Sequence, residues 1–178
     1  MTIPSQDDVL ARWNTLDAAA AAREILPCCG SRAWAKKMAA LRPIADPEQM
    51  FATSDQVWAQ LPAKDWQEAF DSHPRIGQRH ARRATLQSLA WSRQEQQAIV
   101  ASGAEQDATT LALAQGNRQY EDRFGRIFIV CASGKSAAEI LAILNARLHN
   151  TVAMEWFESG EQQRQIAQLR LRRWLGAE

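Results

Sequence analysis

Ser136-Ala137-Ala138-Glu139-Ile140-Leu141 opens the stretch that decides the fold of this 178-residue chain. Serine followed three residues later by glutamate is typical of a capping box, in which the two residues satisfy each other's backbone N–H groups at the start of a helix. Apolar residues then recur at helical spacing, at positions 140, 141, 144, 148 and 152. The pattern predicts a long amphipathic helix that begins at residue 137.

Similar signals occur along most of the chain, which is rich in residues with high helix propensity. Helix starts are predicted at Asp17, Ser31, Asp46-Pro47, Ser54 and Ser92. A further helix, with Trp66, Ala69 and Phe70 on its apolar face, is predicted to run into His73, and another is predicted from Thr109 or Thr110 to Arg123. Gly160 is predicted to separate the long helix from a last amphipathic one. The run 126–132 is β-like but lacks an obvious partner strand, so we expect it to be extended or a buried turn.

These elements predict an all-α fold, a single compact multi-helix domain over residues 1–178. The chain has no Pro/Gly-rich linker, internal repeat or low-complexity tract that would divide it. Its 46% hydrophobic residues suffice for a substantial core, whereas the net charge of +1 gives no overall field to steer nucleic acid or membrane. We therefore expect no nucleic-acid partner and no membrane association.

Three cysteines, two of them adjacent, are a poor basis for a disulfide framework and indicate a reducing compartment. The amino terminus lacks a secretory signal, no later run approaches membrane-spanning length, and the last three residues are not a peroxisomal signal. The sequence thus predicts a cytoplasmic location.

His73-Pro74 is the first candidate for chemistry. Proline disfavours the α-helical region for the residue before it, so His73 should end its segment and project from a fixed turn. Histidine titrates near neutrality, which suits it to donating a proton to a substrate. The residue is therefore a candidate general acid.

Ser92, Glu95 and Gln96 lie within one turn of a helix predicted from Ser92 to about Ala101. The ordinary interpretation is structural, because Ser92 and Glu95 satisfy the capping-box pattern. A helix amino terminus also presents unpaired N–H groups suited to a ligand carboxylate or carbonyl. Helix capping and substrate binding can therefore share these residues.

Arg147 projects between Ile140 and Ile143, inside the apolar side of its helix, whereas His149 falls on the opposite side. A charge in that position needs a partner. An internal ion pair or a snorkelling arginine is the commoner explanation, and an anionic substrate is the alternative.

Several other chemistries are disfavoured. Gly134-Lys135-Ser136 resembles the end of a phosphate-binding loop, but Ile129 stands where the earlier glycine is required. The histidines and cysteines lack metal-ligand spacing, so we expect no metal. Cys131 lies in an apolar run, where cysteine is usually inert packing and not a nucleophile.

Arg75, Arg79, Arg82 and Arg83, with His80 among them, form a basic cluster that could contact phosphates. It lacks interleaved aromatic residues and a nucleic-acid-binding module, so a solvated surface is the simpler explanation. The cluster could also steer an anionic metabolite toward His73.

Several motifs, taken together, resemble the OHCU decarboxylase family in order and spacing. OHCU is 2-oxo-4-hydroxy-4-carboxy-5-ureidoimidazoline, an intermediate of urate breakdown. The motifs are 73–77 (HPRIG), 91–96 (WSRQEQ), 117–125, 128–132 (FIVCA) and 147–150, and residues 26–34 look like the bacterial branch. Arg126 departs from the pattern, since the family often has an apolar or aromatic residue there.

The resemblance implies an all-α, usually dimeric enzyme that converts OHCU to (S)-allantoin and carbon dioxide without metal or organic cofactor. His73 matches the catalytic proton donor, and Glu95 and Arg147 match further catalytic-site residues. The residues that match substrate-binding segments are Pro74, Ser92, Arg93, Gln94, Glu95, Gln96, Phe128, Ile129, Val130, Cys131 and Ala132. A non-catalytic helical module that binds a purine-derived ligand or nucleic acid is the alternative.

Overall fold

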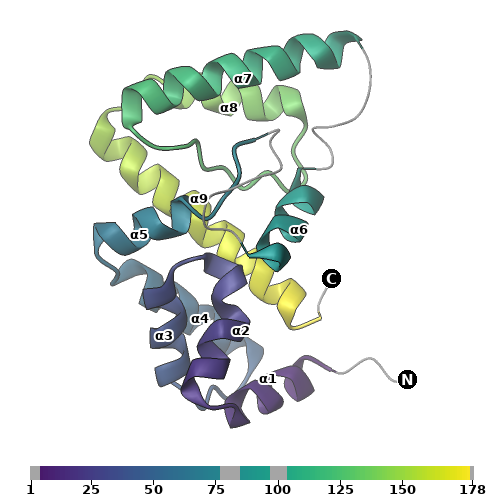
Figure 1. Cartoon of the computed structure of the whole chain (residues 1–178), viewed down its shortest axis with the longest axis vertical. Coiled ribbons are helices and arrows are strands. Elements are labelled where there is room, and N and C mark those ends of the chain that lie inside the picture. The colour runs from purple at the N-terminus through teal and green to yellow at the C-terminus, as the bar shows by residue number, and fades with distance from the viewer. Residues whose placement is uncertain (1–4, 77–84, 97–103, 177–178) are drawn as a thin grey trace. The chain divides into compact units, whose positions relative to one another are not determined.

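The computed structural model describes residues 5–76, 85–96 and 104–176, and the side chains of 104–107 lie outside that description. Within these ranges every regular element is a helix, so the predicted all-α class is confirmed. The helices are α1 (Gln6–Thr15), α2 (Ala18–Cys29), α3 (Arg32–Ala40), α4 (Pro47–Ala59), α5 (Ala63–Phe70), α6 (Leu86–Glu95), α7 (Ala104–Phe124), α8 (Ala137–Arg147) and α9 (Val152–Trp174) (Figure 1).

The chain groups into two compact units, one of residues 1–69 and 164–178 and the other of residues 70–163. In the first unit, α2 packs against α3, and α3 against α4. The indole of Trp13 lies edge-on to Trp174, with ring centroids 5.8 Å apart, and donates to the carbonyl of Ala21. The single domain expected over residues 1–178 stays a prediction.

The second unit is built on α7 and α8, which lie side by side (Figure 1). Its core combines side chains of both helices with those of the segment 128–132. The core residues are Leu113, Tyr120, Phe124, Phe128, Val130, Ala132, Ala137, Ile140 and Leu144. All the described candidate site residues belong to this unit.

Most predicted helix starts are confirmed by their caps. The side chains of Asp17, Ser31 and Asp46 each accept a hydrogen bond from a first-turn amide, and Ser136 with Glu139 forms the predicted capping box. Three starts are wrong. The helix predicted from Thr109 or Thr110 is α7, which already begins at Ala104. Ser54 lies buried inside α4, which continues from the Asp46 cap, and Ser92 lies in the last turn of α6, whose cap is Thr85.

The predictions for the C-terminal third also need correction. The helix that begins at Ala137 ends at Arg147, and Val152 begins α9, where the Thr151 hydroxyl accepts from the amide of Met154. Gly160 does not end a helix, because α9 runs through it. Glycine costs about 1 kcal/mol relative to alanine in a helix interior, which is too little to end a 23-residue helix at this buried position.

Candidate active site

His73 lies in the turn that follows α5. Its backbone N–H donates to the carbonyl of Phe70 at 3.1 Å, and the buried Pro74 prevents the helix from continuing. The half-buried imidazole has Nε2 2.7 Å from Oε1 of Gln163 on α9. The histidine lies in a turn, as predicted, but the helix ends at Phe70 and does not run to His73. The ring is held by a helix far along the chain.

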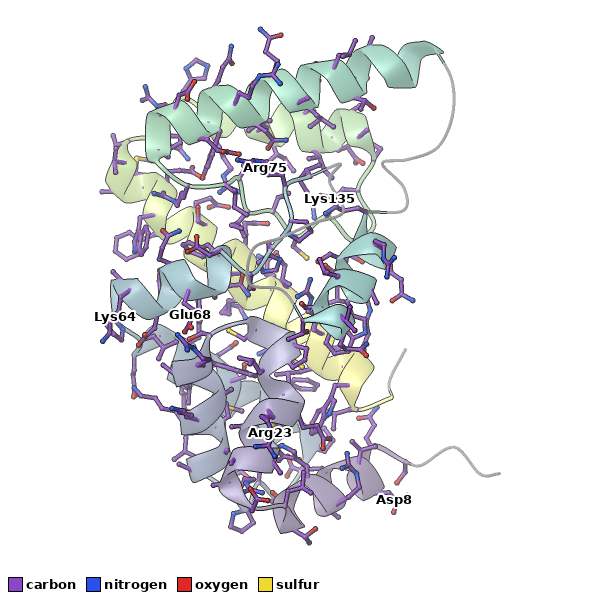
Figure 2. The ribbon with its side chains drawn as sticks, viewed as in Figure 1. Asp8, Arg23, Lys64, Glu68, Arg75 and Lys135 are labelled. Carbon is purple, nitrogen blue, oxygen red and sulfur yellow. The ribbon has the colours of Figure 1, made fainter. Side chains whose placement is uncertain are left out.

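Arg75 fixes the other side of this turn. Its guanidinium donates from Nε and Nη2 to the carboxylate of Glu121 on α7, at 2.5 and 2.7 Å (Arg75 is labelled in Figure 2). Ile76 packs against the core of the second unit. The His73 turn is therefore anchored on both α7 and α9. The other members of the basic cluster, Arg79, His80, Arg82 and Arg83, lie outside the described residues.

Side chains, and not a neighbouring strand, make the hydrogen bonds to the backbone of the segment 128–132. Arg147 Nη1 donates to the carbonyl of Ile129 at 2.7 Å, and the amide of Cys131 donates to Gln162 Oε1 at 2.9 Å. Lys135, labelled in Figure 2 on the loop before α8, donates from Nζ to the carbonyl of Cys131 at 2.8 Å. The prediction of an extended or buried segment without a partner strand is confirmed for the residues described.

Val130 lies between these anchored peptide groups and is itself buried. Within the described ranges, neither its backbone N–H nor its carbonyl has a hydrogen-bond partner. Buried backbone groups are nearly always paired, so a buried peptide group without a partner among the described residues is suited to binding an amide-containing ligand.

Arg147 is buried and forms the internal ion pair that the sequence left open as one explanation. Its Nε donates to Glu155 Oε1 at 2.9 Å, and its Nη2 donates to Glu155 and to the hydroxyl of Ser159. The phenol of Tyr120 donates to the same carboxylate, and Asn150 donates to its other oxygen at 2.8 Å. His149 is exposed, as predicted.

The network changes the ionisation of its members. Burial raises the pKa of Glu155, but the hydrogen bonds from Arg147 and Tyr120 outweigh burial, and the pKa lies below its ordinary value. Burial and the bond to Glu155 raise the pKa of Tyr120 to about 12. The Glu155 carboxylate is therefore charged at neutral pH, with a neutral phenol beside it.

Ser92, Glu95 and Gln96 stand at the C-terminal end of α6, where Ser92 and Glu95 are buried and Gln96 is the C-cap. The predicted capping box between Ser92 and Glu95 is wrong, because Thr85 starts the helix seven residues earlier. The unpaired N–H groups that suit an anionic ligand belong to the other end of a helix, and here the amide of Gln96 donates to the carbonyl of Ser92 at 3.1 Å. A role of these residues in substrate binding stays a prediction that must rest on their side chains.

A family model described as OHCU decarboxylase matches residues 14–172. The chain belongs to the OHCU decarboxylase family. The match covers both compact units and every candidate site residue, so the family predicted from the motifs is confirmed.

Two curated relatives agree with this assignment to the OHCU decarboxylase family. The uric acid degradation bifunctional protein TTL of Arabidopsis thaliana is 34% identical over 145 residues, which are 81% of this chain and 44% of that protein. The 2-oxo-4-hydroxy-4-carboxy-5-ureidoimidazoline decarboxylase of Amia calva is 31% identical over 130 residues, 73% of each chain. This chain therefore spans less than half of the bifunctional plant protein.

Solved structures of similar fold include an OHCU decarboxylase crystallised in the presence of (S)-allantoin. It superposes with a TM-score of 0.73 at 31% identity, covering 86% of this chain and 97% of that one. An (S)-allantoin synthase has a TM-score of 0.66 at 17% identity, covering 93% and 53%, and supports the fold alone.

Two further features of this OHCU decarboxylase family member concern metals and membranes. Among the described residues, no three His, Cys, Asp or Glu side chains lie together as a metal ion would require. In the same ranges, no helix is long and apolar enough to cross a membrane.

Gln162 and Gln163 of α9 contact candidate site residues, and none of the sequence motifs of this OHCU decarboxylase family member included them. Gln163, Ser159 and Glu155 precede Ile166 at spacings of three to four residues, and all are buried. This helical spacing, continued from Ile166 toward the N-terminus, would have placed the three polar residues on the buried side of one helix. The predicted break at Gly160 concealed it, because it divided one helix into two.

Proposed function

We propose that this chain decarboxylates OHCU to (S)-allantoin and carbon dioxide, without a cofactor and with His73 as the proton donor. The observation that carries the proposal is the similarity to the OHCU decarboxylase solved in the presence of (S)-allantoin, which extends over 97% of that chain. The anchored His73 turn and the buried, unpaired peptide of Val130 give the second unit groups suited to this chemistry.

The substrate supplies its own electron sink. When the bond from the ring carbon to the carboxylate breaks, carbon dioxide leaves and the electron pair delocalises into the adjacent carbonyl and ring nitrogen system. The protein has to orient the carboxylate out of the ring plane, stabilise the enolate-like charge and protonate one face. The proton moves from the His73 imidazolium to that carbon, and solvent later reprotonates the neutral ring.

The remaining predicted residues position the substrate. Glu95 orients the substrate and His73 and crowds the departing carboxylate. The peptide of Val130 pairs with an amide of the ring or ureido group, within the segment 128–132. Because its guanidinium is committed to Glu155 and to the carbonyl of Ile129, Arg147 contributes by holding this segment. Pro74, Ser92, Arg93, Gln94 and Gln96 complete the proposed binding surface.

Substitution His73→Asn tests the proposal. A positioned general acid contributes about 10²- to 10⁴-fold to rate, so the folded variant should lose stereospecific turnover by that order. OHCU decays spontaneously to racemic allantoin, and the assay should therefore follow circular dichroism while OHCU is generated in situ. The substitution His149→Asn is the matched control, because His149 is exposed.

Two outcomes would contradict this assignment. If His73→Asn accumulates (S)-allantoin at the wild-type rate, His73 is not the donor. If the folded wild-type protein yields racemic allantoin at the uncatalysed rate, the chain is not a decarboxylase, and the non-catalytic binding module becomes the better explanation.

We also propose a cytoplasmic homodimer, as the cysteine content and the family resemblance predict. Burial raises the pKa of the Cys29 thiol to about 12 and that of its neighbour Cys28 further. Both thiols therefore stay protonated, which is compatible with a reducing compartment.

A further inference from the structure

Gln163 is the residue of α9 that contacts the imidazole of His73. Its side chain is fully buried, and its Oε1 lies 2.7 Å from His73 Nε2. A carbonyl oxygen can only accept, so the nitrogen at this distance has to carry a hydrogen. The other neutral tautomer, with hydrogen on Nδ1, would set two lone pairs against each other at 2.7 Å.

The Gln163 amide is carried by a long helix that also contacts the segment 128–132. Gln163 lies in the interior of the 23-residue helix α9, and the preceding residue, Gln162, accepts from the amide of Cys131 at 2.9 Å. Two consecutive glutamines therefore hold the imidazole and the proposed substrate-binding segment from a single turn of helix. Neither amide carries a charge, so both hold their partners without changing the net charge of the site.

We infer that Gln163 is a positioning residue that keeps a proton on Nε2 of His73 and so assigns the transferred proton to Nδ1. The inference rests on the proposed role of His73 as general acid. In the imidazolium form both nitrogens carry hydrogen. The Nδ1–H bond breaks as the carbon–hydrogen bond of the product forms, and the ring returns to the neutral Nε2–H tautomer that Gln163 binds. The hydrogen bond made by one ring nitrogen generally decides the tautomer of the other.

Nitrogen-15 NMR of histidine-labelled protein tests the tautomer directly. The chain has three histidines, and the His73→Asn variant identifies the His73 signals. Above the titration range of the ring, wild-type His73 should show a protonated Nε2 and a bare Nδ1. The variant Gln163→Leu should show a mixture of tautomers. A wild-type ring protonated mainly on Nδ1, or an unchanged tautomer ratio in Gln163→Leu, would overturn the inference.

Kinetics give the second readout. Residues that orient the histidine ligands of metal sites typically contribute roughly 10- to 100-fold to activity, and by analogy kcat of Gln163→Leu should fall by that factor. KM should change little, because Gln163 acts on the ring and not on the substrate. Gln163→Glu keeps an acceptor in place and should restore the Nε2–H tautomer. Unchanged kcat in Gln163→Leu would overturn the positioning role.

Gln168→Leu is the matched control. Gln168 is also a buried glutamine of α9, and its amide donates to the carbonyl of Phe51 and to Asp55 in the first unit. Its loss should lower stability without changing kcat or the His73 tautomer. The tautomer measurement needs no turnover, so a protein without decarboxylase activity could still show the Nε2–H tautomer. Equally, an active enzyme with the other tautomer would contradict only the role of Gln163.

Discussion

Arg126 is a buried cation whose surroundings match it poorly. Its guanidinium lies over the rings of Trp156 and Phe124, at 5.0 and 5.7 Å, and Nη1 donates to the carbonyl of Phe124 at 3.2 Å. Its Nε and Nη2 are buried and have no hydrogen-bond partner among the residues described. Arg147 is buried in the same unit, but its charge is paired with the carboxylate of Glu155. Both arginines are therefore buried, and only Arg147 has a counter-charge among the contacts described above.

The substitution Arg126→Met should therefore stabilise the protein. An unsatisfied buried donor costs about 1–3 kcal/mol, and methionine removes two such donors while keeping apolar contact with Trp156. We expect the free energy of unfolding in urea to rise by roughly 1–3 kcal/mol, after the loss of the contacts between cation and ring.

Arg123→Met is the control for that measurement. Arg123 also lies over the ring of Phe124, at 5.3 Å, but it is exposed and donates to the carbonyl of Asn150. An exposed substitution of this kind should change stability by about 0.5 kcal/mol or less. Destabilisation by Arg126→Met would mean that its guanidinium is satisfied in the folded protein.

At the scale of elements, the network around Glu155 joins three helices. Tyr120 comes from α7, Arg147 from the end of α8 and Glu155 from the first turn of α9, and Arg147 also holds the carbonyl of Ile129. A buried ion pair adds little to stability by itself, yet removal of one partner leaves an uncompensated charge. The network therefore specifies how these helices and the segment 128–132 are arranged within the second unit.

The substitution Glu155→Gln should lower the free energy of unfolding by about 3–5 kcal/mol, because Arg147 would remain buried without a counter-charge. The pKa of Glu155 is lower in the folded protein than its ordinary value, so the carboxylate contributes stability above that ordinary value. The contribution disappears as pH falls through the folded pKa. Urea unfolding from pH 7 downward should show a shallower acid limb in the variant. Parallel limbs would exclude Glu155 as a source of the acid dependence.

At the scale of the whole molecule, the homodimer is open to a direct test. Sedimentation equilibrium should give twice the monomer mass of 19.9 kDa at micromolar concentration. The exposed apolar side chains Val152, Met154 and Phe157 on the first turns of α9 are suited to an interface, and their replacement by Ser would identify it if the mass fell to that of the monomer. A wild-type protein that sediments as a monomer throughout would contradict the proposal.

The sequence determined the helical class, most helix starts, the turn at His73-Pro74, the inward direction of Arg147 and the family. These features depend on local capping, on periodicity or on motifs, all of which can be read along the chain. The predictions failed at Ser92, where the helix is capped seven residues earlier by Thr85, and at Gly160, where a local helix-breaking preference did not end the helix.

Only the tertiary structure decided which polar side chains hold the His73 turn and the segment 128–132. Gln163 lies 90 residues from His73, Gln162 lies 31 from Cys131, and Glu121 lies 46 from Arg75. Glutamine and glutamate have good helix propensity whether they face solvent or contact another side chain, so no local signal separates the two cases. His73 could therefore be singled out from sequence as a candidate, whereas the amide that contacts its ring could be identified only from the folded chain.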